Sequence, residues 1–241
     1  MTERYNSDSE LLEKAEQLNP VEYAAYIRNK FREFEKRIHF YTPLPENTAV
    51  IGKAPDGLPF MLDLNARYKI LFIGEPQETD KLLETVLISA SGNTRDLSFA
   101  IINGKDSEGK VDEKIKKLNG DHRLVLVRDI DQLGNYQDSR IAAGHSQNNL
   151  RGLVKLEHPI AYFANMENMT GIGTINPEGA DFRNKFQVSG QSFDYVGIQI
   201  PFINKVARMI QNNARINIPL NANRQSFLTT SKDGIINFRS Y

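Results

Sequence analysis

The chain has 241 residues, of which 40% are hydrophobic and 25% charged, and its formal net charge is zero. These proportions are ordinary for a soluble globular protein, and no apolar run approaches the length of a membrane span. The lack of cysteine excludes disulfides, thiol catalysis and cysteine metal sites, and without an apolar signal core at the N-terminus a cytoplasmic location is expected.

The first 45 residues predict a helical extension. A short polar helix is expected over residues 8–19, and Pro20 is well placed to begin a longer one. Apolar residues recur every three or four positions along the longer helix, which indicates one apolar face. They are Tyr23, Ile27, Phe31, Phe34, Ile38 and Tyr41. This stripe must be buried, either against the rest of the chain, which we favour, or in a docking contact with a partner protein.

A β-hairpin and then a strand–turn–helix unit follow the linker at residues 42–47. Two short apolar segments flank an Asp-Gly turn at residues 56–57, which predicts the hairpin. Residues 70–73 form an apolar run ending at Gly74, as expected of a buried parallel strand, and helical spacing follows up to residue 90.

The remaining chain alternates predicted strands with predicted helices, which argues for a parallel α/β sheet. Strands are expected at residues 97–102, 123–127, 160–164, 186–189 and 195–200. Helices are expected at residues 108–118 and 202–213. Residues 217–241 are rich in Asn, Ser and Thr, and we expect them to form a tail that crosses the surface or stays partly disordered.

The turn at Gly74 has the form of a phosphate-binding loop without its residues. A strand that turns at glycine into a helix binds phosphate in P-loop proteins, because loop amides and the helix N-terminus face the anion. In the spacing G-x-x-x-x-G-K-[ST] counted from Gly74, the second glycine falls on Thr79, the lysine on Asp80 and the Ser/Thr on Lys81. The architecture is retained and the phosphate chemistry is replaced.

The order of these pieces resembles the FtsK/SpoIIIE-type P-loop motor ATPases of the HerA/FtsK superfamily. These motors translocate DNA, and relatives drive type VII protein secretion. The hairpin at residues 50–64 resembles the segment before their P-loop. Residues 124–133, 149–169 and 181–189 are similar to their Walker B strand, their sensor region and the strand after it. The resemblance implies a three-layer, RecA-like, mainly parallel sheet over residues 46–216.

The same resemblance implies that the nucleotide site is degenerate. The Asp-Glu pair of Walker B falls on Arg128-Asp129 or on Asp129-Ile130, and neither register supplies two carboxylates. The sensor position is Asn165, and the arginine offered to a neighbouring subunit aligns near Lys155. Phosphoryl transfer needs carboxylates for Mg²⁺ and water and cations for the phosphates. The resemblance therefore implies a pseudo-ATPase with no catalytic or metal-binding residue and at most weak binding of ATP and Mg²⁺.

Three functions remain open from the sequence. The first is a degenerate FtsK-like subunit with a structural or regulatory role in a DNA- or protein-translocating or DNA-processing assembly. Its partners would be copies of itself or an active ATPase of the same family. The second is an active but unorthodox nucleotide hydrolase that uses Lys53, Lys81 and Asp129.

The third function is a nucleic-acid-binding module that uses the basic C-terminal region. From residue 182 to the end there are eight basic residues and only two acidic ones. Arg208, Arg215 and Arg224 are candidate contacts to DNA. These scattered charges alternatively neutralise the acidic part of the same fold, which we favour.

Overall fold

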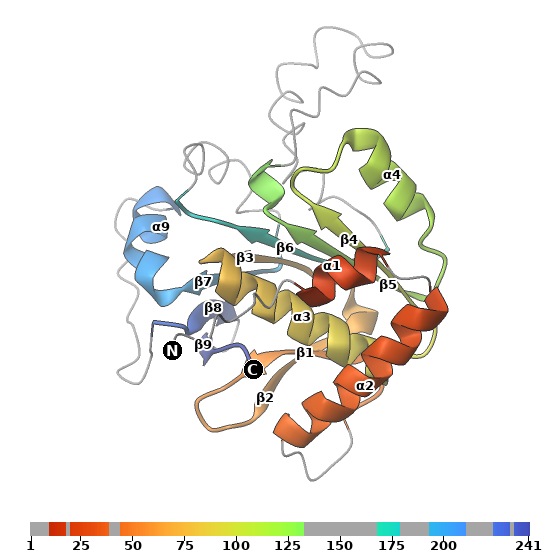
Figure 1. The fold of residues 1–241 in the computed structure, drawn as a ribbon. Coiled ribbons are helices and arrows are strands. Elements are labelled where there is room, and N and C mark those ends of the chain that lie inside the picture. The colour runs from red at the N-terminus through yellow and green to blue at the C-terminus, as the bar shows by residue number, and fades with distance from the viewer. Residues whose placement is uncertain are drawn as a thin grey trace, which may run out of the picture.

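A seven-stranded sheet runs through the domain in the computed structural model (Figure 1). The structure describes residues 10–17, 20–38, 44–132, 168–178, 193–210, 224–231 and 234–241. In spatial order the strands are β4 (Leu97–Asn103), β5 (His122–Arg128), β6 (Thr170–Ile175), β3 (Lys69–Ile73), β7 (Tyr195–Gln199), β8 (Phe227–Ser231) and β9 (Gly234–Phe238). The first five are parallel, β8 pairs antiparallel with β7, and β9 pairs antiparallel with β8. The predicted strand that ends at Gly74 is therefore the central one.

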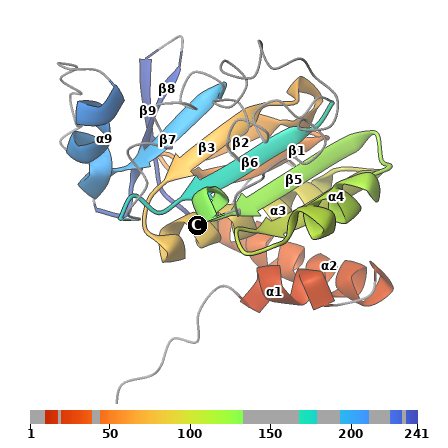
Figure 2. The same ribbon diagram turned by 90° about the horizontal axis from the view of Figure 1, so that it is seen from above.

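Helices cover both faces of the sheet, which confirms the predicted three-layer α/β architecture. One face packs against α1 (Glu10–Gln17), α2 (Pro20–Ile38) and α3 (Pro76–Asn93), and the other against α4 (Glu108–Lys116) and α9 (Ile203–Ile210). Figure 2 shows α1 and α2 on the same side as α3. Neighbouring residues of β3 alternate between the two cores: Ile70 and Phe72 face α3, and Leu71 and Ile73 face the opposite layer.

The predicted hairpin is present as β1 (Thr48–Lys53) and β2 (Pro59–Asp63), which form a separate antiparallel sheet. It packs on the α3 side of the main sheet, where Ala49, Val50 and Ile51 are buried. A bridge between Lys53 and Arg239 ties β1 to the C-terminal segment. The hairpin and the end of the chain therefore belong to one core.

The C-terminal segment differs from its prediction. Residues 227–231 and 234–238 were expected in a surface or partly disordered tail, and this is wrong because they form β8 and β9 of the main sheet. Phe227, Leu228 and Phe238 are buried there, and their burial explains why the segment folds against the domain.

Strand β6 was also missed by the sequence prediction. It lies between β5 and β3 and pairs with both. The expected strands at residues 160–164 and 186–189 lie outside the described residues, so they stay predictions.

The apolar stripe of α2 packs on its own domain. Tyr23, Ile27 and Phe34 are buried, and the rings of Tyr23 and Phe99 lie 5.1 Å apart. A Cβ on Gly92 of α3 would lie 2.1 Å from the Phe31 ring, so this glycine permits the two helices to approach closely. Packing on the chain itself, the favoured interpretation, accounts for the burial of these stripe residues, and docking on a partner stays a prediction. The side chain of Ile38 and all of Tyr41 lie outside the described residues.

Asp106 anchors the start of α4 to the end of β4. Its carboxylate accepts hydrogen bonds from the Asn103 N–H at 3.0 Å and from the ammonium groups of Lys110 and Lys114 at 2.6 and 2.8 Å. Burial alone would raise the pKa of Asp106, but these three donors outweigh it and hold that pKa below its ordinary value. The ionised carboxylate therefore stabilises the folded chain.

We expect Asp106→Asn to lower the free energy of unfolding by about 1.5–3 kcal/mol at pH 7, the range for hydrogen bonds to charged groups. Because the folded-state pKa is depressed, this contribution is complete above the ordinary value of 3.8 and is lost as the pH falls through the folded value. Urea unfolding from pH 7 to pH 3 would show the difference between the two proteins shrinking with acid. Asp121→Asn, at an exposed position, is the control, and a pH-independent difference would contradict the assignment.

Candidate functional site

The turn between β3 and α3 lies at the carboxyl edge of the parallel strands, where ligands bind in open α/β sheets. Only Gly74 and Glu75 separate the last residue of β3 from Pro76, the first residue of α3. In the phosphate-loop spacing, four residues lie between the glycines and the helix opens after them. Here Thr79 and Asp80 already lie within α3. The turn is therefore shorter than a loop that could curl around a phosphate.

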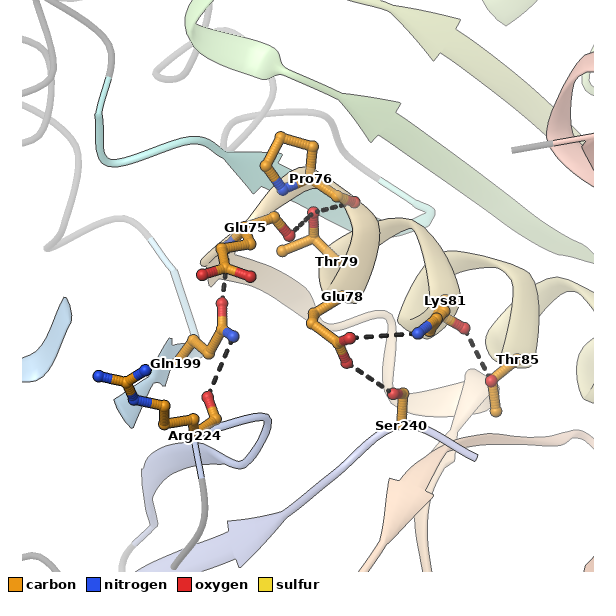
Figure 3. A network of polar contacts seen from close by, with 9 residues as sticks. All are labelled: Glu75, Pro76, Glu78, Thr79, Lys81, Thr85, Gln199, Arg224 and Ser240. Carbon is orange, nitrogen blue, oxygen red and sulfur yellow. Dashed lines mark hydrogen bonds and ion pairs between the residues drawn. The ribbon is translucent and has the colours of Figure 1, made fainter. Parts of the chain in front are cut away.

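Gln199 occupies the space in front of this turn (Figure 3). It is the last residue of β7 and is 1% exposed. Its Oε1 accepts a hydrogen bond from the Glu75 N–H at 2.7 Å, and its Nε2 donates to the Arg224 carbonyl at 3.1 Å. A Cβ on Gly74 would lie 2.7 Å from the same Oε1 and 3.0 Å from the ring of Phe227. One amide that could face a ligand is thus bonded within the chain, and the space beside it is filled.

The polar groups in the first turns of α3 bond to one another. The N–H groups of Glu78 and Thr79 both donate to the Glu75 carbonyl at 3.0 Å. Lys81 Nζ donates to Glu78 Oε1 at 3.1 Å, and Ser240 Oγ donates to Glu78 Oε2 at 3.3 Å. Figure 3 shows the contacts of Glu78 with Lys81 and Ser240. Lys81, one position late for the phosphate-loop lysine, is therefore held by a carboxylate of its own helix.

Asp80 and Arg128 form a mostly buried ion pair between α3 and the end of β5. Arg128 Nε and Nη2 donate to the two Asp80 carboxylate oxygens at 3.0 and 2.6 Å, and the side chains are 17% and 12% exposed for Arg128 and Asp80. Burial raises the pKa of Asp80, and Arg128 acts in the opposite direction. Burial acts to lower the pKa of Arg128, but Asp80 outweighs it. At the positions that the sequence prediction assigned to the Walker lysine and a Walker B acid, the charges are thus reversed.

Asp129 follows β5 at the same edge. Its backbone is left-handed, with φ of 47°, and its N–H donates to Thr174 Oγ1 at 3.1 Å. Burial raises the pKa of its carboxyl, although Arg128 and Lys105 oppose the shift. In the part of the chain that the structure describes, no three His, Asp or Glu side chains gather as a metal cluster. Its Walker B role stays a prediction, and the residue before it in sequence is Arg128.

The structure brings together part of the predicted site. Gly74, Thr79, Asp80, Lys81 and Asp129 lie along the carboxyl edge, whereas Asn165 and Lys155 fall outside the described residues. The sequence prediction missed Gln199 and Thr174. Both end or nearly end a parallel strand, and that position is the signal that places a residue at this edge.

Of the candidate DNA contacts, only the placement of Arg224 is described in full. It is exposed, and its carbonyl accepts the bond from Gln199. Arg215 and the side chain of Arg208 lie outside the described residues, so contact with nucleic acid stays a prediction.

Solved structures of other proteins share the fold of this chain. No protein-family model and no curated protein matches the sequence. Solved structures match with TM-scores of 0.50 for the cytoplasmic domain of the type VII secretion ATPase EccC of Thermomonospora curvata, 0.55 for the cytoplasmic domain of EssC, and 0.51 for the pCW3 conjugation coupling protein TcpA in a monomer form with ATPγS. The chain has the P-loop ATPase fold of FtsK/SpoIIIE-type proteins.

The likeness to these proteins is one of fold alone, because the identities are only 10%, 8% and 13% in the same order. The matches cover 83%, 86% and 83% of this chain. They cover 29% of the EccC chain, 46% of EssC and 67% of TcpA. Among the helices that the structure describes, none is both long enough and apolar enough to cross a membrane.

Proposed function

We propose that this chain is a catalytically degenerate FtsK-like subunit with a structural or regulatory role in a DNA- or protein-translocating or DNA-processing assembly. The observation that carries the proposal is the Gln199 side chain in front of Gly74, bonded to the turn on one side and to Arg224 on the other. A phosphate at this turn would have to displace a side chain that is already hydrogen-bonded at both ends.

Charge supports the same proposal. Glu75, Glu78 and Asp80 place three carboxylates at the start of α3, where the helix dipole favours negative charge. They satisfy the dipole with the chain's own groups and repel a nucleotide triphosphate. Lys81 is held by Glu78, and Arg128 by Asp80. Both of these cations are therefore already neutralised by carboxylates.

The kinds of assembly are proposed from the structural neighbours, which include a secretion ATPase and a conjugation coupling protein. A subunit that keeps this fold but has lost turnover would act through contacts with copies of itself or with an active ATPase of the same fold. A cytoplasmic location is part of the proposal. Purification of the native complex, followed by identification of its other subunits, would name the assembly.

The degenerate site is tested by equilibrium titration with a fluorescent ATP analogue, with and without Mg²⁺. We expect no saturable binding up to about 1 mM, the weak end of ordinary enzyme–substrate constants. An active P-loop ATPase under the same conditions is the positive control. Saturable, Mg²⁺-dependent binding that is lost in Lys53→Ala or Lys81→Ala would instead support the unorthodox hydrolase.

Gln199→Ala distinguishes a nucleotide site that Gln199 merely covers from a site whose phosphate-binding residues are missing. The change leaves the Glu75 N–H and the Arg224 carbonyl without their partner, so we expect it to lower the free energy of unfolding by about 1–3 kcal/mol. We also expect it to leave nucleotide binding undetectable, because the two-residue turn and its carboxylates remain. Urea unfolding and the same nucleotide titration measure both effects. If Gln199→Ala gained Mg²⁺-dependent nucleotide binding, the Gln199 side chain alone would be blocking a functional nucleotide site, and the proposal would be wrong.

A further inference from the structure

A groove of about 810 Å³ lies between α2 and the start of β4. The end of α3 and the segment after α4 complete its walls. It is far from the candidate nucleotide site along the strands, because it meets β4 at its first residues whereas that site lies where the strands end. Its volume is in the range of ligand-binding pockets.

The groove runs along the outer edge of β4, the last strand on its side of the sheet as far as the structure describes it. Leu97, Ser98 and Phe99 all line it and are all half-buried, whereas residues 100–102 are buried. Consecutive strand residues alternate between the two faces of a sheet. Because all three line it, the groove reaches the start of β4, the edge strand of the sheet. An unpaired strand edge presents backbone N–H and C=O groups to a partner strand.

Buried hydroxyls without partners line the same groove. Tyr23 Oη, Ser91 Oγ and Thr94 Oγ1 are buried and make no hydrogen bond. Tyr23 is 6% and Thr94 9% exposed. Burial raises the pKa of Tyr23, and Tyr26 and Glu84 add to the shift, so its phenol stays protonated and able to donate. Buried polar groups are rarely left unpaired in folded proteins, and each unpaired group calls for an explanation.

The shape and chemistry of the groove select the occupant. Its lining on α2 extends from Tyr23 to Phe31, which is about 12 Å at 1.5 Å per residue. A chain of about four extended residues covers that length. We propose that the groove binds an extended polypeptide segment of a partner protein, which pairs as an added strand with the edge of β4 at residues 97–99. This is the β-augmentation mode of recognition.

The lining also indicates the composition of that segment. Ile27 and Phe31 offer apolar contacts for alternate side chains, and the hydroxyls pair with polar groups between them. The groove lining includes two basic residues, Arg28 and Lys117, and one acidic residue, Asp96. This excess of positive charge favours an acidic residue in the bound segment. The Lys117 ammonium also pairs with Glu113, but both side chains are exposed and such pairs are weak. The inference does not depend on the nucleotide site.

Two substitutions test the hydroxyls without disturbing the fold. Tyr23→Phe and Thr94→Val each remove an oxygen that has no partner, so the free protein should melt at the same temperature as the unmodified protein or higher. A clear fall in melting temperature would show that the hydroxyls already have partners and would contradict the premise. Arg28→Gln tests the charge, and Arg32→Gln, exposed on the same helix and outside the groove lining, is its matched control.

The binding test uses a random peptide library displayed on phage and selected against the full chain. Enriched peptides, once synthesised, should bind about tenfold more weakly to the Tyr23→Phe, Thr94→Val double variant, and Arg32→Gln should bind them normally. Hydrogen exchange should slow at residues 97–99 when the peptide is bound. Failure to enrich any peptide, equal binding to the double variant, or protection elsewhere would overturn the proposal.

Two other occupants are distinguishable outcomes. A concentration-dependent dimer that the double variant abolishes would assign the groove to a second copy of this chain. One-to-one binding of the dye 8-anilinonaphthalene-1-sulfonate, lost in the double variant and without any enriched peptide, would assign it to a small amphiphile. Either result contradicts a peptide site.

Discussion

Asp80→Ala is expected to lower the free energy of unfolding by about 3–5 kcal/mol, because it leaves the Arg128 guanidinium buried without a partner. The carboxylate accepts both guanidinium hydrogen bonds, and the two side chains are mostly buried. Coulomb attraction within the pair only offsets the cost of removing two charges from water. Breaking the pair therefore costs much more than the pair itself contributes.

The expected recovery of a double variant distinguishes this mechanism from loss of packing. Asp80→Leu with Arg128→Met replaces both charges by apolar groups, and such replacements of buried ion pairs are often neutral or stabilising. Urea unfolding of the two single variants and the double variant completes the cycle, and Glu113→Ala, which breaks an exposed ion pair, is the control. If the loss in the double variant equalled the sum of the two single losses, Asp80 and Arg128 would not be coupled, and this mechanism would be wrong.

The same ion pair makes a phosphate site difficult to restore by a single substitution at Asp80. Asp80→Lys, the change that would restore the Walker lysine, places a second cation against Arg128 and should destabilise the chain. The charge swap Asp80→Lys with Arg128→Asp keeps opposite charges and matches the Walker polarity. Because only Gly74 and Glu75 form the turn, we expect the swap to recover stability without recovering nucleotide binding.

Phe31→Asp with Phe34→Asp is expected to unfold the whole domain. Phe34 is 1% exposed and lies edge-on to Tyr241 at 5.5 Å between ring centroids, and Phe31 packs against Gly92. Truncating a buried phenylalanine alone costs about 3–5 kcal/mol, and an unpaired buried carboxylate adds to that. The sum is comparable to the whole stability of an ordinary domain, about 5–15 kcal/mol.

Circular dichroism and light scattering together measure this outcome. The double variant should lose its cooperative melt, whereas Arg32→Gln with Glu33→Gln, two exposed positions on α2, should melt normally. A variant that keeps its cooperative fold but loses an assembly would contradict the packing described here and return the stripe to a docking role. No change in either measurement would make α2 dispensable.

Much of the fold was predictable because its signals are local. The apolar run at residues 70–73, the glycine that ends it and the helical spacing that follows are contiguous in sequence, and β3 and α3 begin and end close to their predicted positions. The same holds for β4, α4 and β5. By contrast, β6 reads Thr-Gly-Ile-Gly-Thr-Ile, and its two glycines weaken the strand signal. The strands β8 and β9 lie in a segment whose composition suggested a tail.

The site was predictable only in part, because its main contacts join distant residues. Local spacing predicted Asp80 at the position of the phosphate-loop lysine, and the family resemblance predicted Asp129 at the end of the Walker B strand. The contact of Asp80 with Arg128 spans 48 positions, and that of Glu75 with Gln199 spans 124. The periodic pattern of apolar residues in a sequence does not reveal contacts between residues so far apart in the chain. Only the rule that parallel strands end at one edge would have brought Gln199 to Gly74.

Steady-state phosphate release from Mg²⁺-ATP by the purified, unmodified chain shows whether this chain hydrolyses nucleotide. With the turn closed by Gln199 and Asp80 paired to Arg128, we predict a rate indistinguishable from that of Asp129→Ala and from buffer. Asp129 is the one carboxylate at the aligned Walker B position, so any genuine turnover should depend on it. Robust, Mg²⁺-dependent release by the unmodified chain that Asp129→Ala abolishes would contradict the account.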